Sequence, residues 1–345
     1  MVLLCPRIHF FEINDQPWCV VLLDYAVHKL TCAYRWPNYL REKVQSGLTL
    51  AWTFRVPVLQ KTSPAELVAS TLRRVLASSV TNYTYVDFCA GAGGPTPYIE
   101  RDLNEQLMVD RQKSSTTANG HATKPYSSTN DQGDAGAVKF VLTDLHPHIA
   151  EWTKAAAKSE NLSFVSNPVD AANAPTDLIK RDGKKTFRLF FLAFHHFDDP
   201  MAREILRNTM ETADGFGYVI LCVGRLKFAD EAPDSIFELQ ERTISSMITV
   251  TAMGILMFFI SPFYFWRSPG HLFFTYIIPL IPLILVLDGW VSSLRTRTSE
   301  EVQALMKECG ASADGWTIKS GAEQHTWPTG YMTYVIGVND KAKVK

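Results

Sequence analysis

Short apolar runs alternate with helical patterns in the middle of the chain, and this alternation predicts its architecture. The runs at 83–89, 139–143 and 188–193 have the length and composition of buried strands. Each is followed by a segment with apolar residues at helical spacing, at 97–107, 147–158 and 201–211. Because strands that alternate with helices pair in parallel, we expect an α/β fold with a doubly wound, mostly parallel sheet.

Two further elements are predicted near the end of the chain. Residues 299–309 form a helical pattern ended by Gly310, and residues 331–338 form a closing strand. We therefore expect residues 288–345 to complete the domain whose core is 81–242. A helical segment at 1–80 is expected to pack on that core.

One stretch inside the core is too polar to fold. Residues 111–136 contain four apolar side chains and cannot bury enough surface to offset the entropy of the chain. The sequence predicts a disordered insert at 108–137.

Two long uncharged runs follow the core. Residues 243–266 carry no charge, and residues 268–287 contain one titratable side chain, His271. Each run approaches the length that crosses a bilayer, so we predict a transmembrane or re-entrant hairpin at 243–287 that turns at 267–270. A buried helical lid over an apolar substrate is the alternative.

The position of this hairpin in the chain predicts its orientation. Strands before and after it are expected in one sheet, so both of its ends must lie on one side of the membrane. Arg242, Arg295 and Arg297 would then flank it on the cytosolic side, together with the catalytic domain.

Composition narrows the classes of function. The 345 residues are 46% hydrophobic and 20% charged, which excludes a wholly disordered chain. Lys and Arg number 34 against 35 Asp and Glu, so the basic excess that favours nucleic-acid binding is absent. The six cysteines are widely spaced, which indicates neither a disulfide framework nor a zinc site and fits a reducing compartment. The first residues do not read as a secretory signal.

The strongest local motif is the glycine-rich turn after the first predicted strand. The strand ends at Asp87, and Gly91 and Gly93 allow a ligand to approach the backbone at the start of a helix. A dinucleotide fingerprint is less favoured, because Thr96 stands at its third glycine and Asp87 would repel a pyrophosphate. The motif favours a cationic or zwitterionic ligand such as S-adenosylmethionine, although an ordinary strand-to-helix turn is the open alternative.

Two more carboxylates follow later strands. Asp144 ends the second strand, where an acid commonly binds the ribose hydroxyls of an adenosine ligand. When the predicted insert is left out, Asp144 follows the glycine-rich turn by about 20 to 25 residues, which is the spacing expected of an acid that binds the ribose. Asp144 could instead, or in addition, cap the helix near Pro147. Asp170, in the segment 168–171, could edge the adenine pocket.

A pair of histidines follows the next predicted strand. His195 and His196 could act as a general base, anchor a substrate or bind a metal, or they could cap the following helix. No metal is predicted, because the further ligands that a metal needs are not evident. Glu238 is the second candidate for the base, with helix capping as its alternative.

These residues resemble the class I S-adenosylmethionine-dependent methyltransferases. VDFCAGAGG, at 86–94, stands where that family has its acidic, glycine-rich cofactor loop, with Cys89 in place of the first glycine. A closer resemblance is to membrane-associated methyltransferase-domain proteins of fungi and bacteria, which have segments similar to 11–18, 193–200, 237–243 and 288–301.

The resemblance implies a function and a set of site residues. It implies S-adenosylmethionine as cofactor and methyl transfer to an unidentified small molecule or lipid, with an apolar acceptor expected. The residues assigned to the cofactor are Asp87, Cys89, Gly91, Gly93, Asp144 and Asp170. The alternatives are a nicotinamide-dependent oxidoreductase and a membrane scaffold without catalytic activity.

The chain departs from this group in two places. Residues 19–36 and 218–235 are extra relative to similar proteins, and their equal length suggests retained short introns or gene-model errors. If they are protein, residues 218–223 compete with 236–239 for the fifth strand. Sequencing the spliced transcript tests this hypothesis.

Overall fold

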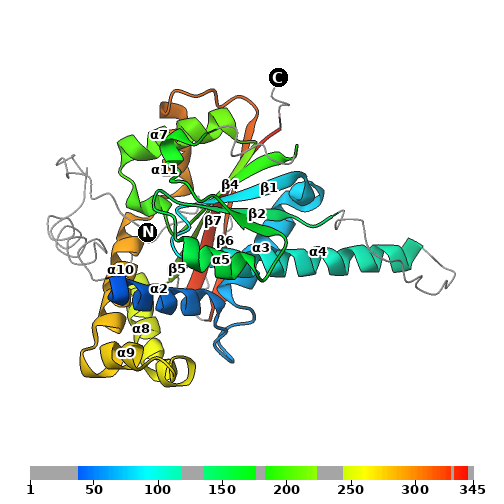
Figure 1. Ribbon diagram of the computed structural model, residues 1–345. Helices are drawn as coiled ribbons and strands as arrows, with labels where there is room; N and C mark the ends of the chain where they lie inside the picture. Colours follow the sequence, from blue (N-terminus) through cyan, green and yellow to red (C-terminus); the bar gives the residue numbers. More distant parts are fainter. Residues whose placement is uncertain (1–37, 119–135, 176–182, 224–243, 328–329, 341–345) are drawn as a thin grey trace, which may run out of the picture.

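A twisted seven-stranded sheet forms the centre of the molecule (Figure 1). The computed structural model describes residues 38–118, 136–175, 183–223, 244–327 and 330–340. The strands are β1 (Tyr83–Phe88), β2 (Lys139–Thr143), β3 (Leu162–Phe164), β4 (Lys185–Phe191), β5 (Gly215–Val223), β6 (Trp316–Thr326) and β7 (Gly330–Asn339). Their order is β3-β2-β1-β4-β5-β7-β6, and β7 alone is antiparallel to both of its neighbours. The predicted doubly wound, mostly parallel sheet is confirmed.

Helices cover both faces of the sheet. On one face lie α3 (Pro64–Leu76), α4 (Thr96–Ala118) and α5 (Ile149–Ala156), and on the other lie α7 (Asp199–Thr212) and α11 (Ser299–Glu308). The short turns η2 (Ala77–Asn82), η3 (Ala171–Asn173) and η4 (Phe194–His196) connect these elements. Each face has its own cluster of buried apolar side chains, so the sheet is buried on both sides, as a parallel sheet requires.

Local sequence signals set the helix boundaries. Ser63 and Thr298 begin α3 and α11 with reciprocal capping boxes, in which Glu66 and Glu301 return a hydrogen bond to the cap backbone. Asp198 accepts a bond from the Met201 backbone at the start of α7. The predicted helix at 299–309 begins where α11 begins, the helix predicted at 201–211 begins two residues inside α7, and the start of α3 was not predicted.

Two strands lack a clear sequence signal. β3 has three residues, too few for a periodic pattern, and β6 is an edge strand with mostly partly or fully exposed side chains. β6 is held by its antiparallel pairing with β7 rather than by an apolar run. The segment Gly215–Val223 forms β5 between β4 and β7, so residues 218–223 occupy the fifth strand, while 236–239 lie outside the described residues.

The predicted insert begins too early. Helix α4 continues to Ala118, so residues 108–118 are helical rather than disordered. Arg73 of α3 pairs with Asp110, and Gln106 donates to Ser70, so the neighbouring helix supports this extension. Residues 119–135 lie outside the described part of the chain.

The apolar region between β5 and α11 folds as a helical hairpin. It contains α8 (Ile244–Tyr264), α9 (Pro269–Leu272), the π-helical turn η5 (Phe273–Ile277) and α10 (Leu280–Arg295). The break after α8, at 265–268, overlaps the turn predicted at 267–270, whose last two residues begin α9. The end of the hairpin was predicted wrongly, because α10 continues past residue 287 to Arg295. By length and composition, one helix could cross a membrane, at Met247–Tyr264, or two if the bent pair of α9–η5 and α10 is one span.

Small residues hold this hairpin together. A Cβ atom on Gly254 would lie 2.2 Å from Val286, and one on Gly289 would lie 2.6 Å from Val250, so α8 and α10 approach closely and run antiparallel. Helix α2 (Asn38–Thr53) packs against α10, through Leu40 and Gly47 (Figure 1). The hairpin is therefore attached to the sheet domain and does not project freely from it.

Candidate cofactor site

The loop after β1 has a backbone that few residue types adopt easily. Gly91, Gly93 and Gly94 all have positive φ angles, of 54°, 105° and 47°. Cys89 has φ of 63°, in the left-handed region, at the position where the resembling family has glycine. The backbone thus keeps the shape of a glycine loop although one glycine is replaced.

Asp144 ties this loop to the end of β2. Its buried carboxylate accepts hydrogen bonds from the backbone N–H groups of Gly91, at 2.9 Å, and His146, at 2.8 Å. The indole Nε1 of Trp152 in α5 donates to the Gly91 carbonyl at 2.8 Å. Since a carboxylate can accept about four bonds, Asp144 retains acceptor capacity for a ligand.

Asp87 lies beneath the same loop at the end of β1. Its carboxylate accepts a hydrogen bond from the hydroxyl of Thr96, the first residue of α4. Burial raises the pKa of Asp87 well above its usual range, only partly offset by the Thr96 bond. Thr96, which stands at the third glycine position of a dinucleotide fingerprint, thus serves as a partner for this acid.

The carboxylates predicted for the cofactor converge on Cys89. Burial, then the negative charges of Asp144, Asp87 and Asp170, hold the pKa of the Cys89 thiol far above its usual range. Asp170 also caps η3 by accepting a bond from the Ala172 backbone at 2.9 Å. Asp87 and Asp144 lie at the carboxyl ends of the paired strands β1 and β2, and the backbone N–H of Val169, next to Asp170, donates to the Asp144 carbonyl at 2.9 Å, so the three acids lie at one edge of the sheet.

The two histidines lie in η4, directly after β4, and are both buried. Their rings contact each other with centroids 4.0 Å apart. His195 Nε2 forms a 3.0 Å hydrogen bond with the Ser292 hydroxyl of α10. Burial, with the nearby charges of Arg295 and Arg297, lowers the pKa of His195 to about 3, so this ring is neutral at physiological pH.

Arg297, which follows α10, forms hydrogen bonds with the turn that contains the two histidines. Its guanidinium donates to the carbonyl of Phe194 at 3.1 Å and to that of Phe197 at 2.6 Å, and it pairs with Asp199 at 2.8 Å. Its side chain is 10% exposed. Arg297, which follows the predicted hairpin, thus bonds the carbonyls of the η4 turn.

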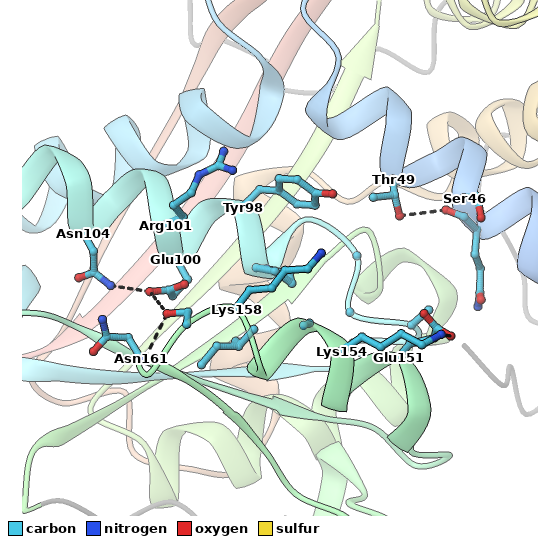
Figure 2. Close-up of a pocket in the computed structure, with 18 of the residues that line it drawn as sticks. Ser46, Thr49, Tyr98, Glu100, Arg101, Asn104, Glu151, Lys154, Lys158 and Asn161 are labelled. Atoms are coloured by element: carbon cyan, nitrogen blue, oxygen red, sulfur yellow. Dashed lines mark hydrogen bonds and ion pairs between the residues drawn. The ribbon is translucent and has the colours of Figure 1, made fainter. Parts of the chain in front are cut away.

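A cavity of about 690 Å³ lies beside the glycine loop, between α2, α4 and α5. Figure 2 shows Ser46 and Thr49 of α2, Tyr98 of α4 and Lys158 around it. Gly93 and Gly94 border it, so the cavity reaches the loop. No local sequence pattern predicts this cavity, because helices distant in the chain form it.

Two residues named in the sequence analysis lie outside the part of the chain that the structure describes. They are Glu238 and Arg242. Within the part of the chain that the structure describes, no group of His, Cys, Asp and Glu side chains could hold a metal ion. Ser292 and Arg297, which contact the histidine turn, were not identified as site residues, because only tertiary packing brings α10 to β4.

No protein-family model matches the chain, and no curated protein matches it. The chain is similar to the plantazolicin methyltransferase BpumL in complex with SAH, with 12% identity, a TM-score of 0.46, and coverage of 93% of this chain and 98% of that chain. It is also similar to magnesium protoporphyrin IX methyltransferase ChlM from Synechocystis PCC 6803 with bound SAM, with 8% identity, a TM-score of 0.36, and coverage of 94% and 98%.

A third similar structure is the pyocyanin biosynthetic protein PhzM, with 12% identity, a TM-score of 0.39 and coverage of 80% of this chain. This chain spans 55% of the length of PhzM. The strand order, with β7 antiparallel, is that of the doubly wound, mostly parallel sheet that the sequence resemblance implied. With TM-scores below 0.5, the residues of the site itself must decide which ligand fits.

Proposed function

We propose that this protein is an S-adenosylmethionine-dependent methyltransferase. The observation that carries the proposal is the convergence of Asp87, Asp144 and Asp170 on the glycine loop after β1. Carboxylates at this edge of the sheet, two of them buried and Asp170 exposed, favour a ligand with positive charge and disfavour a pyrophosphate. S-adenosylmethionine carries a sulfonium and an ammonium group. The ribose hydroxyls of its adenosine can donate hydrogen bonds to a carboxylate.

Each residue has a proposed role at this edge of the sheet. Asp144, already fixed by Gly91 and His146, accepts from the ribose hydroxyls, and Asp170 edges the adenine. Asp87 stabilises the shape of the loop through its hydrogen bond with Thr96, while Gly91 and Gly93 allow close approach of the ligand to the backbone. Bound S-adenosylmethionine supplies an electrophilic methyl group, and the protein contributes mainly by orienting the acceptor for in-line attack.

His196 is the better of the two histidine candidates for a general base. His195 is bonded to Ser292 and has a pKa of about 3, which makes it a weak base. We propose that His195 positions the turn while His196 contacts the acceptor. Glu238 remains the second candidate for the base.

We also propose that the protein associates with a membrane through its apolar hairpin, with the sheet domain on the cytosolic side. Ser292 and Arg297 join α10 and the segment after it to the turn after β4, so the hairpin lies next to the site. An apolar small molecule or a lipid would reach the site from such a membrane. An alkaline carbonate wash of membranes tests this association. Release of the full-length tagged protein into the soluble fraction would contradict attachment through the hairpin.

Titration calorimetry of the detergent-purified protein tests the cofactor. We expect saturable binding of S-adenosylmethionine and no binding of NADH. Asp144→Ala should weaken the binding of S-adenosylmethionine by about tenfold or more, because a charged hydrogen-bond acceptor is lost. Asp144→Asn, which keeps the size of the side chain, should weaken it as well.

Asp314→Ala is the matched control. Asp314 is an exposed acid just before β6, at the opposite edge of the sheet from the glycine loop, so its loss should leave the affinity unchanged. Equal affinity in the Asp144 and Asp314 variants would remove the assignment of Asp144. Saturable binding of NADH without binding of S-adenosylmethionine would overturn the proposed function.

A further inference from the structure

Exposed apolar side chains gather on a surface that is only partly formed by the hairpin. We call it the apolar rim and define it as Val58, Leu59, Phe263, Trp266 and Trp327. These residues come from the loop after α2, the end of α8 with the turn that follows it, and the turn after β6. All five are exposed, and Trp266 and Trp327 are exposed by 63% and 64%.

Ring contacts and hydrogen bonds join the three segments into one surface. The ring of Phe54 packs edge-on against Tyr264 at the end of α8, with centroids 5.4 Å apart. The Trp327 backbone N–H donates to the Leu59 carbonyl at 2.8 Å. Gln60 donates to the Thr326 hydroxyl at 2.6 Å, so the loop after α2 is bonded to the turn after β6.

Val58 is an unfavourable residue at its position for the stability of the isolated protein. Its side chain is 99% exposed, and its φ is 70°, in the left-handed region. A β-branched residue is a rare outlier there, and glycine or asparagine would be less strained and more soluble. A strained, fully exposed valine is expected where the side chain contacts a partner.

The charges around the rim are of one sign. Arg55 and Lys61 are exposed on the loop after α2, and Arg267 is exposed on the turn after α8. No Asp or Glu occurs at 43–65, 244–287 or 324–339. The rim thus combines tryptophans, aliphatic side chains and cations, the combination that suits the headgroup region of an anionic bilayer.

The rim lies at the same edge of the sheet as the candidate site. The turn after β6 leads into Gly330, which pairs with Val223 at the carboxyl end of β5. Cys89 and His195 follow the carboxyl ends of β1 and β4 at this edge. A partner on the rim would therefore face the side of the protein on which the site opens.

We propose that the apolar rim docks on the surface of a membrane that contains anionic lipids. Trp266, Trp327 and Val58 enter the interfacial layer, and Arg55, Lys61 and Arg267 contact lipid phosphates. This inference rests on the proposed membrane association of the hairpin and deepens it, but it does not depend on methyl transfer, since it concerns residues outside the cofactor site. It also extends membrane contact from the hairpin to the loop after α2 and the turn after β6.

Vesicle flotation of the full-length protein tests the proposal. Protein freed of detergent is mixed with vesicles of phosphatidylcholine alone or of equal parts phosphatidylcholine and phosphatidylglycerol. We expect stronger flotation with the anionic vesicles and a decrease at high salt, because the charge contribution is screened. Val58→Asn and Trp327→Ser should each weaken flotation with anionic vesicles by about fivefold.

Val58→Asn separates docking from folding. Asparagine tolerates the left-handed backbone, so the melting temperature should stay the same or rise while flotation falls. Val109→Asn, at another exposed valine on α4, is the matched control and should float like the unmodified protein.

Three results would overturn the proposal. The first is equal flotation of the Val58 and Val109 variants, and the second is equal binding of the unmodified protein to neutral and anionic vesicles. The third is a change in the oligomeric mass of the Val58→Asn variant, relative to the unmodified protein, in the absence of lipid. The last result would identify the rim as a contact between copies of the chain. Binding of S-adenosylmethionine is measured separately, so failure of the rim and failure of the cofactor site are distinguishable.

Discussion

At the scale of single residues, the candidate site contains backbone strain that glycine would avoid. Cys89 and Leu192, which lie just after β1 and β4, both have positive φ, of 63° and 50°. These strands are neighbours in the sheet, so the two strained residues lie at the edge where the carboxylates converge. Such strain persists only where the surrounding structure imposes it, and it is common at ligand sites.

Cys89 provides a direct measure of this strain. Cys89→Gly removes the side chain and the strain, whereas Cys89→Ala removes the thiol and keeps the strain. We expect the glycine variant to be more stable than the alanine variant by about 1 kcal/mol, within the cost of a left-handed residue. Urea unfolding of both variants measures the difference, and an alanine variant at least as stable would show that the loop relaxes.

At the scale of elements, the hairpin depends on close approach of two apolar helices. Gly254 on α8 faces Val286, and Gly289 on α10 faces Val250. The indole of Trp290 also donates to the Met247 carbonyl, at 3.1 Å. Glycines allow van der Waals contact between the backbones, which stabilises helix pairs even without a hydrophobic driving force.

Larger side chains at these glycines should separate the helices. Gly254→Val should lower the free energy of unfolding by about 1 to 3 kcal/mol, because the new Cβ would lie 2.2 Å from Val286 and the packing has no free space. Ala252→Val, on the exposed side of α8, is the control and should have little effect. Thermal unfolding in one detergent compares the two variants, and equal melting temperatures would contradict the close packing.

At the scale of the whole molecule, buried polar groups connect the hairpin to the sheet. The bond between His195 and Ser292 joins η4 to α10, and Arg297 bonds the carbonyls of Phe194 and Phe197. Because these bonds lie at the site, we expect the hairpin and the site to be lost together when the protein unfolds. Acid pH should weaken this connection.

The pH dependence follows from the lowered pKa of His195. The pKa is about 3 in the folded protein against 6.5 in the unfolded chain, so the unfolded chain binds more protons between these values. Stability should therefore fall as pH decreases from 6.5 towards 3. The raised pKa values of Asp87, Glu100 and Asp102 act in the opposite direction, since their contribution is lost as pH rises.

A substitution isolates the histidine contribution. His195→Asn does not titrate, so the stability difference between the unmodified protein and this variant should shrink or reverse as pH falls from 6.5 towards 4. Urea unfolding at several pH values measures it. A difference that does not change with pH would mean that His195 keeps an ordinary pKa in the folded protein.

The sequence by itself determined the elements whose signals are local. The apolar runs predicted β1, β2 and β4, the capping residues fixed the starts of α3, α7 and α11, and the uncharged runs predicted the hairpin. The sequence also predicted Asp87, Asp144 and the glycine loop as candidate site residues, because an acid at a strand end and a run of glycines are recognisable without a structure.

Only the tertiary structure decided features that depend on contacts between distant segments. It extended α4 to Ala118 through the pairing of Asp110 with Arg73, and it placed β6 by pairing with β7. It brought Asp144 to the Gly91 amide, Ser292 to His195, and Val58 into one surface with Trp327. These contacts join residues far apart in the chain, so no local periodicity encodes them, and they form only when the packed sheet positions its helices and loops.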